Sequence, residues 1–329
     1  MDTREYPKVI LTHPLPEDWI TELREVCELV VGPEGGTGLT PELRQELPGA
    51  QGLLCLLDDP IDASVLQEAE SLQVVTNMAV GYDNIDVETC TELGIPVGNT
   101  PGVLTEGTAD LTMALLLAAA RKLPQASRDA REGRWDTWNP TGWLGADLKD
   151  AVVGIIGMGK IGSAVARRAA AFETRLLFHN RSLKPELAEQ LNAEQVGLDR
   201  LLRASDFICL HVPLTDQTRW MIDSEALAAM KETAVLVNAA RGGVVHTTAL
   251  VSALRNGQIR AAALDVTDPE PLPPEHPLYD LDNCLITPHI GSATHHTRQT
   301  MAALAVENIL AGLRGEKLPY CVNPEVYQA

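Results

Sequence analysis

The sequence is poor in basic residues. Lys and Arg together number 26 against 45 Asp and Glu in 329 residues, which gives a net charge of −19 at pH 7. This acidic surplus argues against nucleic acid and against an anionic membrane as partners, because both are repelled by a negative surface. A small anionic substrate stays open, since a few local cations can override the global field.

Cysteine and long apolar runs are also scarce. There are six cysteines and no two of them form a Cys-x-x-Cys pair, so we expect neither a metal site nor a disulfide framework. The longest apolar run, residues 111–120, is shorter than the ~20 residues of a bilayer-spanning helix. The first residues lack the apolar core of a signal peptide. These absences predict a cytoplasmic protein.

What the sequence does contain is two series of short apolar runs separated by helical segments. Such alternation predicts α/β domains, each a parallel sheet with helices on both faces. A helix is expected over 17–27 and another over 295–315, whereas residues 133–148, with three tryptophans among Gly and Pro, are expected to be irregular. The predicted strands are 8–13, 28–31, 52–57, 72–80 and 95–99, then 152–157, 175–180, 207–214, 234–241, 261–267 and 284–289.

A glycine motif, Gly157-x-Gly159-x-x-Gly162, follows the first strand of the second series and opens an amphipathic helix. In that context it predicts a dinucleotide-binding turn. Gly157 permits the tight turn, Gly159 lets the backbone approach a pyrophosphate, and Gly162 lets the helix pack on the strand. Lys160 and Ile161 complete the turn, and the helix N-terminus presents its N–H groups to the phosphates.

The next strand ends where an NAD enzyme usually carries an acidic residue for the ribose 2′-hydroxyl. This chain has Asn180, Arg181 and Ser182 there, with Lys184 close behind. No carboxylate is present to repel a 2′-phosphate, and Arg181 can pair with one. We therefore predict NADP(H) as the preferred cofactor, with NAD(H) as the alternative. These residues could also be an ordinary solvated loop.

Polar residues follow three later strands of the second series: Arg241, Asp265 with Glu270, and His289. Each has an ordinary explanation when taken alone. Together they supply what reduction of a 2-oxo acid needs. Arg241 can clamp a carboxylate, His289 can donate a proton to the carbonyl oxygen, and Glu270 can hold the other ring nitrogen.

The chain resembles the D-2-hydroxyacid dehydrogenases, and among them the glyoxylate/hydroxypyruvate reductases of animal type. The resemblance covers nearly the whole length and is carried by residues 77–86, 154–162, 238–245, 264–272 and 288–301, with 308–316 in support. It implies two flavodoxin/Rossmann-like, doubly wound domains with a cleft between them. The substrate domain would be 1–104 plus 294–329, and the dinucleotide domain 105–293.

The resemblance also implies roles for single residues. Arg241, Glu270 and His289 match the catalytic positions. Val80 and Gly81 match the loop whose N–H groups meet the substrate carboxylate. Trp138 matches a residue that reaches the partner's pocket in a homodimer, although a plain interface tryptophan explains it as well. The positions that contact the cofactor are matched by Thr108, Pro213, Ala239, Asp265 and Gly291. The resemblance places Asp265 near the nicotinamide amide.

The sequence therefore predicts NADPH-dependent reduction of glyoxylate and hydroxypyruvate. Another 2-oxo acid, such as 2-ketogluconate or phosphohydroxypyruvate, is the alternative within the same enzyme class. A transcriptional corepressor shares this fold, and the discriminating features are its long flanking tails and its tolerance of a damaged active site. Here the three catalytic positions are intact and the tails are short.

Overall fold

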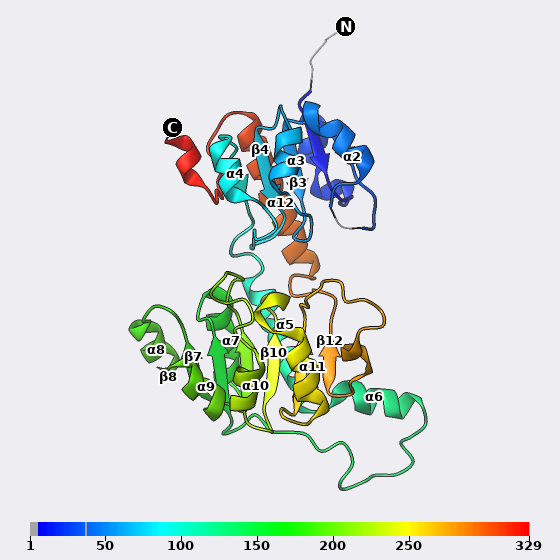
Figure 1. Ribbon diagram of the computed structural model, residues 1–329, viewed down its shortest axis with the longest axis vertical. Helices are drawn as coiled ribbons and strands as arrows, with labels where there is room; N and C mark the ends of the chain where they lie inside the picture. Colours follow the sequence, from blue (N-terminus) through cyan, green and yellow to red (C-terminus); the bar gives the residue numbers. More distant parts are fainter. Residues whose placement is uncertain (1–5, 37, 329) are drawn as a thin grey trace. The chain divides into compact units, whose positions relative to one another are not determined.

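The computed structural model describes residues 6–36 and 38–328, and these divide into two compact units. The first unit holds the described residues of 1–104 together with those of 294–329, and the second holds 105–293. The C-terminal helix α12 (His295–Leu313), orange in Figure 1, lies with the blue and cyan elements of the first unit and packs on its strands β3 and β4. The first unit is therefore discontinuous in sequence.

Within its described residues, the first unit is built around a five-stranded sheet of order β2-β1-β3-β4-β5, in which all strand pairs are parallel. This is the strand order of flavodoxin-like sheets, in which the direction of winding reverses between β1 and β3. Its elements are β1 (Lys8–Leu11), η1 (Glu17–Trp19), α1 (Thr21–Val26), β2 (Glu28–Val31), α2 (Pro41–Glu46), η2 (Leu47–Gly49), β3 (Gly52–Cys55), α3 (Ala63–Glu68), β4 (Val74–Asn77), α4 (Val87–Glu92), β5 (Val97–Gly98), α12 and η5 (Pro324–Tyr327).

The second unit, all of whose residues are described, contains a seven-stranded parallel sheet of order β12-β11-β10-β9-β6-β7-β8. Six of these strands follow the Rossmann order, with the reversal between β6 and β9. Its elements are α5 (Thr105–Ala120), α6 (Leu123–Arg131), β6 (Val152–Ile156), α7 (Lys160–Ala170), β7 (Arg175–His179), α8 (Pro185–Leu191), β8 (Ala193–Gln195), α9 (Leu198–Ala204), β9 (Phe207–Leu210), α10 (Ser224–Ala229), β10 (Val235–Asn238), η3 (Gly242–Val244), α11 (Thr247–Arg255), β11 (Ala261–Leu264), η4 (Pro277–Asp280) and β12 (Cys284–Ile286).

The seven-stranded sheet is buried on both faces. Successive residues of β6 enter different core clusters: Ile155 packs with Phe178 and Phe207 on one face, and Ile156 with the cluster on the other. All four of these side chains are at most 1% exposed. Continuous apolar runs such as Val152–Ile156 are what a strand covered by helices on both sides requires.

Helix α5 carries the longest apolar run of the sequence. It packs against α7 and against strands β10 and β11 inside the second unit, and half of its sixteen residues are buried. The run is therefore explained by the core of the unit. Of the helices in the described part of the chain, none combines the length and the apolar character that crossing a membrane demands.

The predicted α/β class with parallel sheets is confirmed, whereas several element bounds are not. Residues 17–27 form η1 and α1 with a break at Ile20 instead of one helix. The strand predicted over 72–80 is limited to β4, because the apolar residues Met78 and Ala79 are buried in a loop. Strand β8 has no counterpart among the predictions. Residues 133–148 contain neither helix nor strand, as predicted.

Candidate active site

Two of the three motif glycines are required by the protein's own backbone. Gly157 follows β6 with a φ of 99°, and a Cβ there would lie 2.6 Å from the carbonyl oxygen of His211. A Cβ on Gly162 would lie 2.1 Å from the carbonyl oxygen of Gly157. These glycines allow strand β6, strand β9 and helix α7 to approach one another closely, as the motif predicts.

The third glycine, Gly159, is different because a Cβ there would have nothing within 4 Å. Gly159 is the N-cap of α7, and no side chain caps this end of the helix. Lys160 and Ile161 begin the first turn, so their N–H groups lack intrahelical partners. Open space before an uncapped helix N-terminus suits a phosphate, and the residues present therefore fit a dinucleotide pyrophosphate.

The loop after β7 is organised by side chains that hold its backbone. The Asn180 side chain accepts a hydrogen bond from the Met158 N–H (3.2 Å) and donates to the carbonyl oxygen and hydroxyl of Ser182. Gln195, on β8, donates to the carbonyl oxygens of Asn180 and Ser182 and accepts from the N–H of Lys184. Asn180 thus ties this loop to the glycine turn. The contribution of Gln195 was missed, because β8 gave no signal in the sequence.

Arg181 and Lys184 are exposed in this loop. Neither side chain forms an ion pair with a carboxylate of the described residues. Two cations without a competing acid lie where the strand after the glycine turn ends. This arrangement is suited to a phosphate on the adenosine ribose.

His211 is a half-buried residue that no motif of the sequence singled out. It follows β9, and its N–H donates to the carbonyl oxygen of Ile156, on the strand where the sheet order reverses. Both ring nitrogens are buried and have no partner among the described residues. Burial lowers the pKa of His211 to about 4, so the ring is neutral at pH 7. A histidine inside an apolar run, residues 207–214, was the available signal.

The structure brings together the side chains predicted to be catalytic. Nδ1 of His289 lies 2.5 Å from Oε1 of Glu270, and Oε2 of Glu270 accepts a hydrogen bond from the Thr267 N–H at 3.0 Å. The positive charge of Arg241 acts on the Glu270 carboxyl. Arg241 itself follows β10 and donates from Nη1 to the carbonyl oxygen of Ala240.

The protonation state of Glu270 follows from opposing influences. Burial raises the pKa of its carboxyl, but the hydrogen bond and charge of His289, the Thr267 N–H and the charge of Arg241 together hold that pKa below its usual value. Glu270 is therefore ionised at neutral pH and can only accept. The short contact then requires that Nδ1 of His289 carries the hydrogen, which leaves Nε2 to exchange protons with a substrate.

The loop that carries His289 is held by Asp265, a carboxylate that is only 2% exposed. Its oxygens accept from the Thr287 hydroxyl (2.7 Å), the Ile290 N–H (2.8 Å) and the Gly291 N–H (2.8 Å). The Asp265 carbonyl oxygen accepts from the His289 N–H. His289 itself has a φ of 51°, a conformation that a non-glycine residue adopts only when its surroundings impose it. Asp265 therefore orients the imidazole through the backbone.

The remaining cofactor positions of the second unit lie on the same edge of the sheet or face it. Thr108, buried on α5, donates to the Gly291 carbonyl oxygen at 3.3 Å. Ala239 is in the turn that connects β10 to Arg241. Pro213 follows β9, and its carbonyl oxygen accepts from the Thr218 hydroxyl at 2.6 Å.

Val80 and Gly81 belong to the first unit, in the loop after β4. Neither N–H donates to a backbone acceptor among the described residues. The loop lies at the carboxyl edge of its own parallel sheet, where α/β domains bind ligands.

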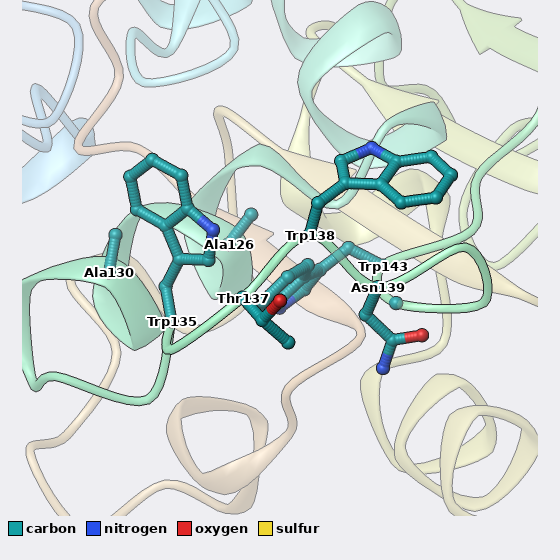
Figure 2. Close-up of a pocket in the computed structure, with 8 residues that line it drawn as sticks. Ala126, Ala130, Trp135, Thr137, Trp138, Asn139 and Trp143 are labelled. Atoms are coloured by element: carbon teal, nitrogen blue, oxygen red, sulfur yellow. The ribbon is translucent and has the colours of Figure 1, made fainter.

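Trp138 lies in the irregular segment after α6 and is 82% exposed. This segment and the α6 residues Ala126 and Ala130 line a surface pocket of about 330 Å³, together with Trp135 and Trp143. In Figure 2 the indoles of Trp135 and Trp138 lie apart, with Trp143 between them. The Trp143 indole N–H donates to Asp129 at 2.7 Å. Trp138 is thus placed on a surface of the second unit.

Comparison with known proteins gives a consistent result. The family described as D-isomer specific 2-hydroxyacid dehydrogenase, NAD binding domain, matches residues 113–291. A glyoxylate reductase of Thermococcus kodakarensis is 47% identical over 324 residues, covering 97% of both chains. A crystal structure of a Thermus thermophilus protein is 47% identical with a TM-score of 0.89, covering 96% of this chain and 99% of that one. An NADPH-dependent glyoxylate/hydroxypyruvate reductase of Sinorhizobium meliloti, crystallised with NADP and malonate, is 33% identical with a TM-score of 0.85, covering 97% and 98%.

Proposed function

Because the chain belongs to the D-isomer specific 2-hydroxyacid dehydrogenases, we propose that it reduces glyoxylate to glycolate and hydroxypyruvate to D-glycerate with NADPH. It is an oxidoreductase of that family. The names of its relatives support the substrates, and the neighbour crystallised with NADP supports the cofactor. The observation that carries the proposal is the contact between Glu270 and His289, with Arg241 close enough to stabilise the carboxylate.

The three side chains divide the work at the carbonyl group. Arg241 pairs with the substrate carboxylate and polarises the adjacent carbonyl. His289 donates the proton on Nε2 to the carbonyl oxygen, and Glu270 stabilises the charged imidazole and fixes its orientation through Nδ1. When bound, the nicotinamide cofactor would supply the hydride to the carbonyl carbon. In the oxidative direction the neutral His289 takes the proton back.

The second unit is assigned to the dinucleotide and the first to the substrate. The pyrophosphate would be held by N–H groups of the Gly157–Gly162 turn, and the 2′-phosphate by Arg181 and Lys184. Ser182 and Asn180 would line the ribose, whereas Thr108, Pro213, Ala239, Asp265 and Gly291 would surround the nicotinamide end. Preference for NADPH over NADH rests on the two cations and on the lack of an acid beside them.

Two further assignments rest on the resemblance. Val80 and Gly81 would bind the substrate carboxylate through their N–H groups. The exposed Trp138 would contact a second copy of the chain in a homodimer. A cytoplasmic location completes the proposal.

The test is a steady-state panel of glyoxylate, hydroxypyruvate and 2-ketogluconate, each with NADPH and with NADH. We expect the two smaller acids with NADPH to give the highest kcat/KM. A higher kcat/KM for 2-ketogluconate would reassign the substrate within the family. If neither cofactor is oxidised by any 2-oxo acid, phosphohydroxypyruvate included, the proposal fails.

A further inference from the structure

The loop after β4 in the first unit is held by a buried asparagine. Asn77, the last residue of β4, is fully buried, and its Nδ2 donates to the Gly81 carbonyl oxygen and to Asn84 Oδ1, each at 2.8 Å. Asn84 in turn donates to the carbonyl oxygens of Leu56 and Asp59, both at 2.9 Å. The Gly81 carbonyl is thus fixed to the body of the first unit.

A second asparagine holds the preceding carbonyl. Asn99 follows β5, and its Nδ2 donates to the Val80 carbonyl oxygen at 2.9 Å. Asn99 is itself anchored by its backbone, because its N–H donates to the Tyr320 carbonyl oxygen and its carbonyl oxygen accepts from Asn308 Nδ2, both at 3.1 Å. Two consecutive carbonyls of one loop are therefore bound by two side chains from neighbouring strands.

The consequence for the N–H groups follows from the planar trans peptide. In each peptide the N–H points opposite to the C=O. With the Val80 carbonyl held by Asn99, the Gly81 N–H points away from Asn99. With the Gly81 carbonyl held by Asn77, the Tyr82 N–H points away from Asn77. Neither N–H has a backbone acceptor among the described residues, although the loop follows a buried strand.

We propose that Asn77 and Asn99 are positioning residues for the carboxylate of the 2-oxo acid. They hold two carbonyls toward the body of the first unit and so orient the N–H groups of Gly81 and Tyr82. The Tyr82 N–H is thereby added to those of Val80 and Gly81 as a donor to the anion. Consecutive backbone N–H groups fixed in this way form an anion site, and their neutral supports add no charge that would repel a carboxylate. This inference rests on the proposed function and adds the side chains that organise the substrate end of the reaction.

The test compares Asn99→Ala and Asn99→Asp with the unsubstituted protein. Alanine frees the Val80 carbonyl, and aspartate places an oxygen against it. We expect KM for glyoxylate and Kd for oxamate, measured on the enzyme saturated with NADPH, to rise together by about tenfold. We expect kcat to change less than about threefold and the NADPH Kd to stay constant, because the proton donor and the cofactor site lie in other elements.

The matched control is Asn283→Ala. Asn283, like Asn99, is half-buried. Its Nδ2 donates to the carbonyl oxygens of Leu254 and Arg260, at the amino-terminal edge of the seven-stranded sheet. It should share any loss of stability but not the change in KM. Asn77→Ala should reproduce the Asn99 effect. If that variant does not fold, the two Asn99 variants decide the matter alone.

The outcomes separate the two proposals. If the unsubstituted enzyme reduces glyoxylate while both Asn99 variants keep its KM and oxamate Kd, the positioning role is overturned and the proposed function stands. A fall in kcat at constant KM also overturns the role. If the unsubstituted protein neither reduces a 2-oxo acid nor binds oxamate, the proposed function fails and the positioning role fails with it.

Discussion

The two sheets share a winding pattern but differ at the point where their strand order reverses. In the second unit, the strand at the reversal is followed at once by the glycine turn and helix α7, whose N-terminus is uncapped and open. In the first unit, strand β1 ends at Leu11 and helix α1 begins only at Thr21. No helix N-terminus among the described residues is presented directly after the strand there.

The reversal in the first unit is filled by a carboxylate. Asp59 is fully buried, and its oxygens accept from the Thr12 hydroxyl (2.5 Å), the Leu56 N–H (2.8 Å) and the Gly38 N–H (2.7 Å). Three donors of the kind that can bind a phosphate are instead hydrogen-bonded to the Asp59 carboxylate. The same topology therefore gives a nucleotide site or a scaffold, depending on the residues that follow its central strand.

If the chemistry resides at the edge of the seven-stranded sheet, His289→Ala should have the largest effect. We expect kcat for glyoxylate to fall at least about a thousandfold, because a positioned proton donor contributes up to about 10⁴. The NADPH Kd, measured by fluorescence titration, should change less than about twofold, since a proton donor to the carbonyl is not expected to hold the phosphates. His295→Ala, an exposed histidine at the start of α12, is the control and should retain full activity. An active His289→Ala enzyme would contradict the assignment.

Asp59→Ala tests whether the residue at the reversal point of the first sheet stabilises the fold and does not bind the cofactor. The substitution removes the acceptor of the Leu56 and Gly38 N–H groups and leaves the Thr12 hydroxyl only the Leu54 carbonyl oxygen at 3.5 Å. We expect the free energy of unfolding in urea to fall by about 3 kcal/mol. The NADPH Kd of the folded variant should be unchanged. Asp18→Ala removes an exposed carboxylate of the same unit and should alter neither quantity. A large loss of NADPH affinity in Asp59→Ala would break the distinction between the two sheets.

Features that depend on residues close together in the sequence could be predicted, whereas features that depend on contacts between distant residues could not. The glycine turn and the buried strands were readable because their signals are local and periodic. Met78 and Ala79 were predicted to continue the strand because they are apolar. They are apolar because they are buried in the loop that follows β4, and they do not pair in the sheet. Asn99 gave no signal, since its role arises from a hydrogen bond to Val80, on a neighbouring strand's loop.

The candidate catalytic side chains were named from the sequence, but their arrangement was not. The contact between Glu270 and His289 spans 19 residues, and it is short because β11 pairs with β12 and the two residues follow these strands. The contribution of Asp265 to the His289 loop likewise depends on a turn with a positive φ, which no residue pattern there announces.

Two glycine substitutions should distinguish a glycine that leaves room for the cofactor from one that is required for packing within the second unit. Gly159→Ala places a methyl group in open space, at a φ of −82° that alanine tolerates. It should leave the unfolding midpoint unchanged and weaken NADPH and NADH equally, by about tenfold or 1.4 kcal/mol. Gly162→Ala meets the Gly157 carbonyl oxygen and should destabilise the protein itself. Unchanged cofactor affinity in Gly159→Ala would show that the open space is not the pyrophosphate site.

Arg181→Ala should give the smallest effect and the most selective one. Arg181 is exposed, so solvent screens its charge, and we expect KM for NADPH to rise by about fivefold at low salt and by less at high salt. KM for NADH should stay within about twofold, because NADH has no 2′-phosphate for the guanidinium to meet. Arg200→Ala, which removes an exposed arginine paired with Glu194 in the same unit, controls for the loss of one positive charge. An equal loss for both cofactors would place Arg181 on the shared pyrophosphate, and the open N-terminus of α7 would then not act alone there.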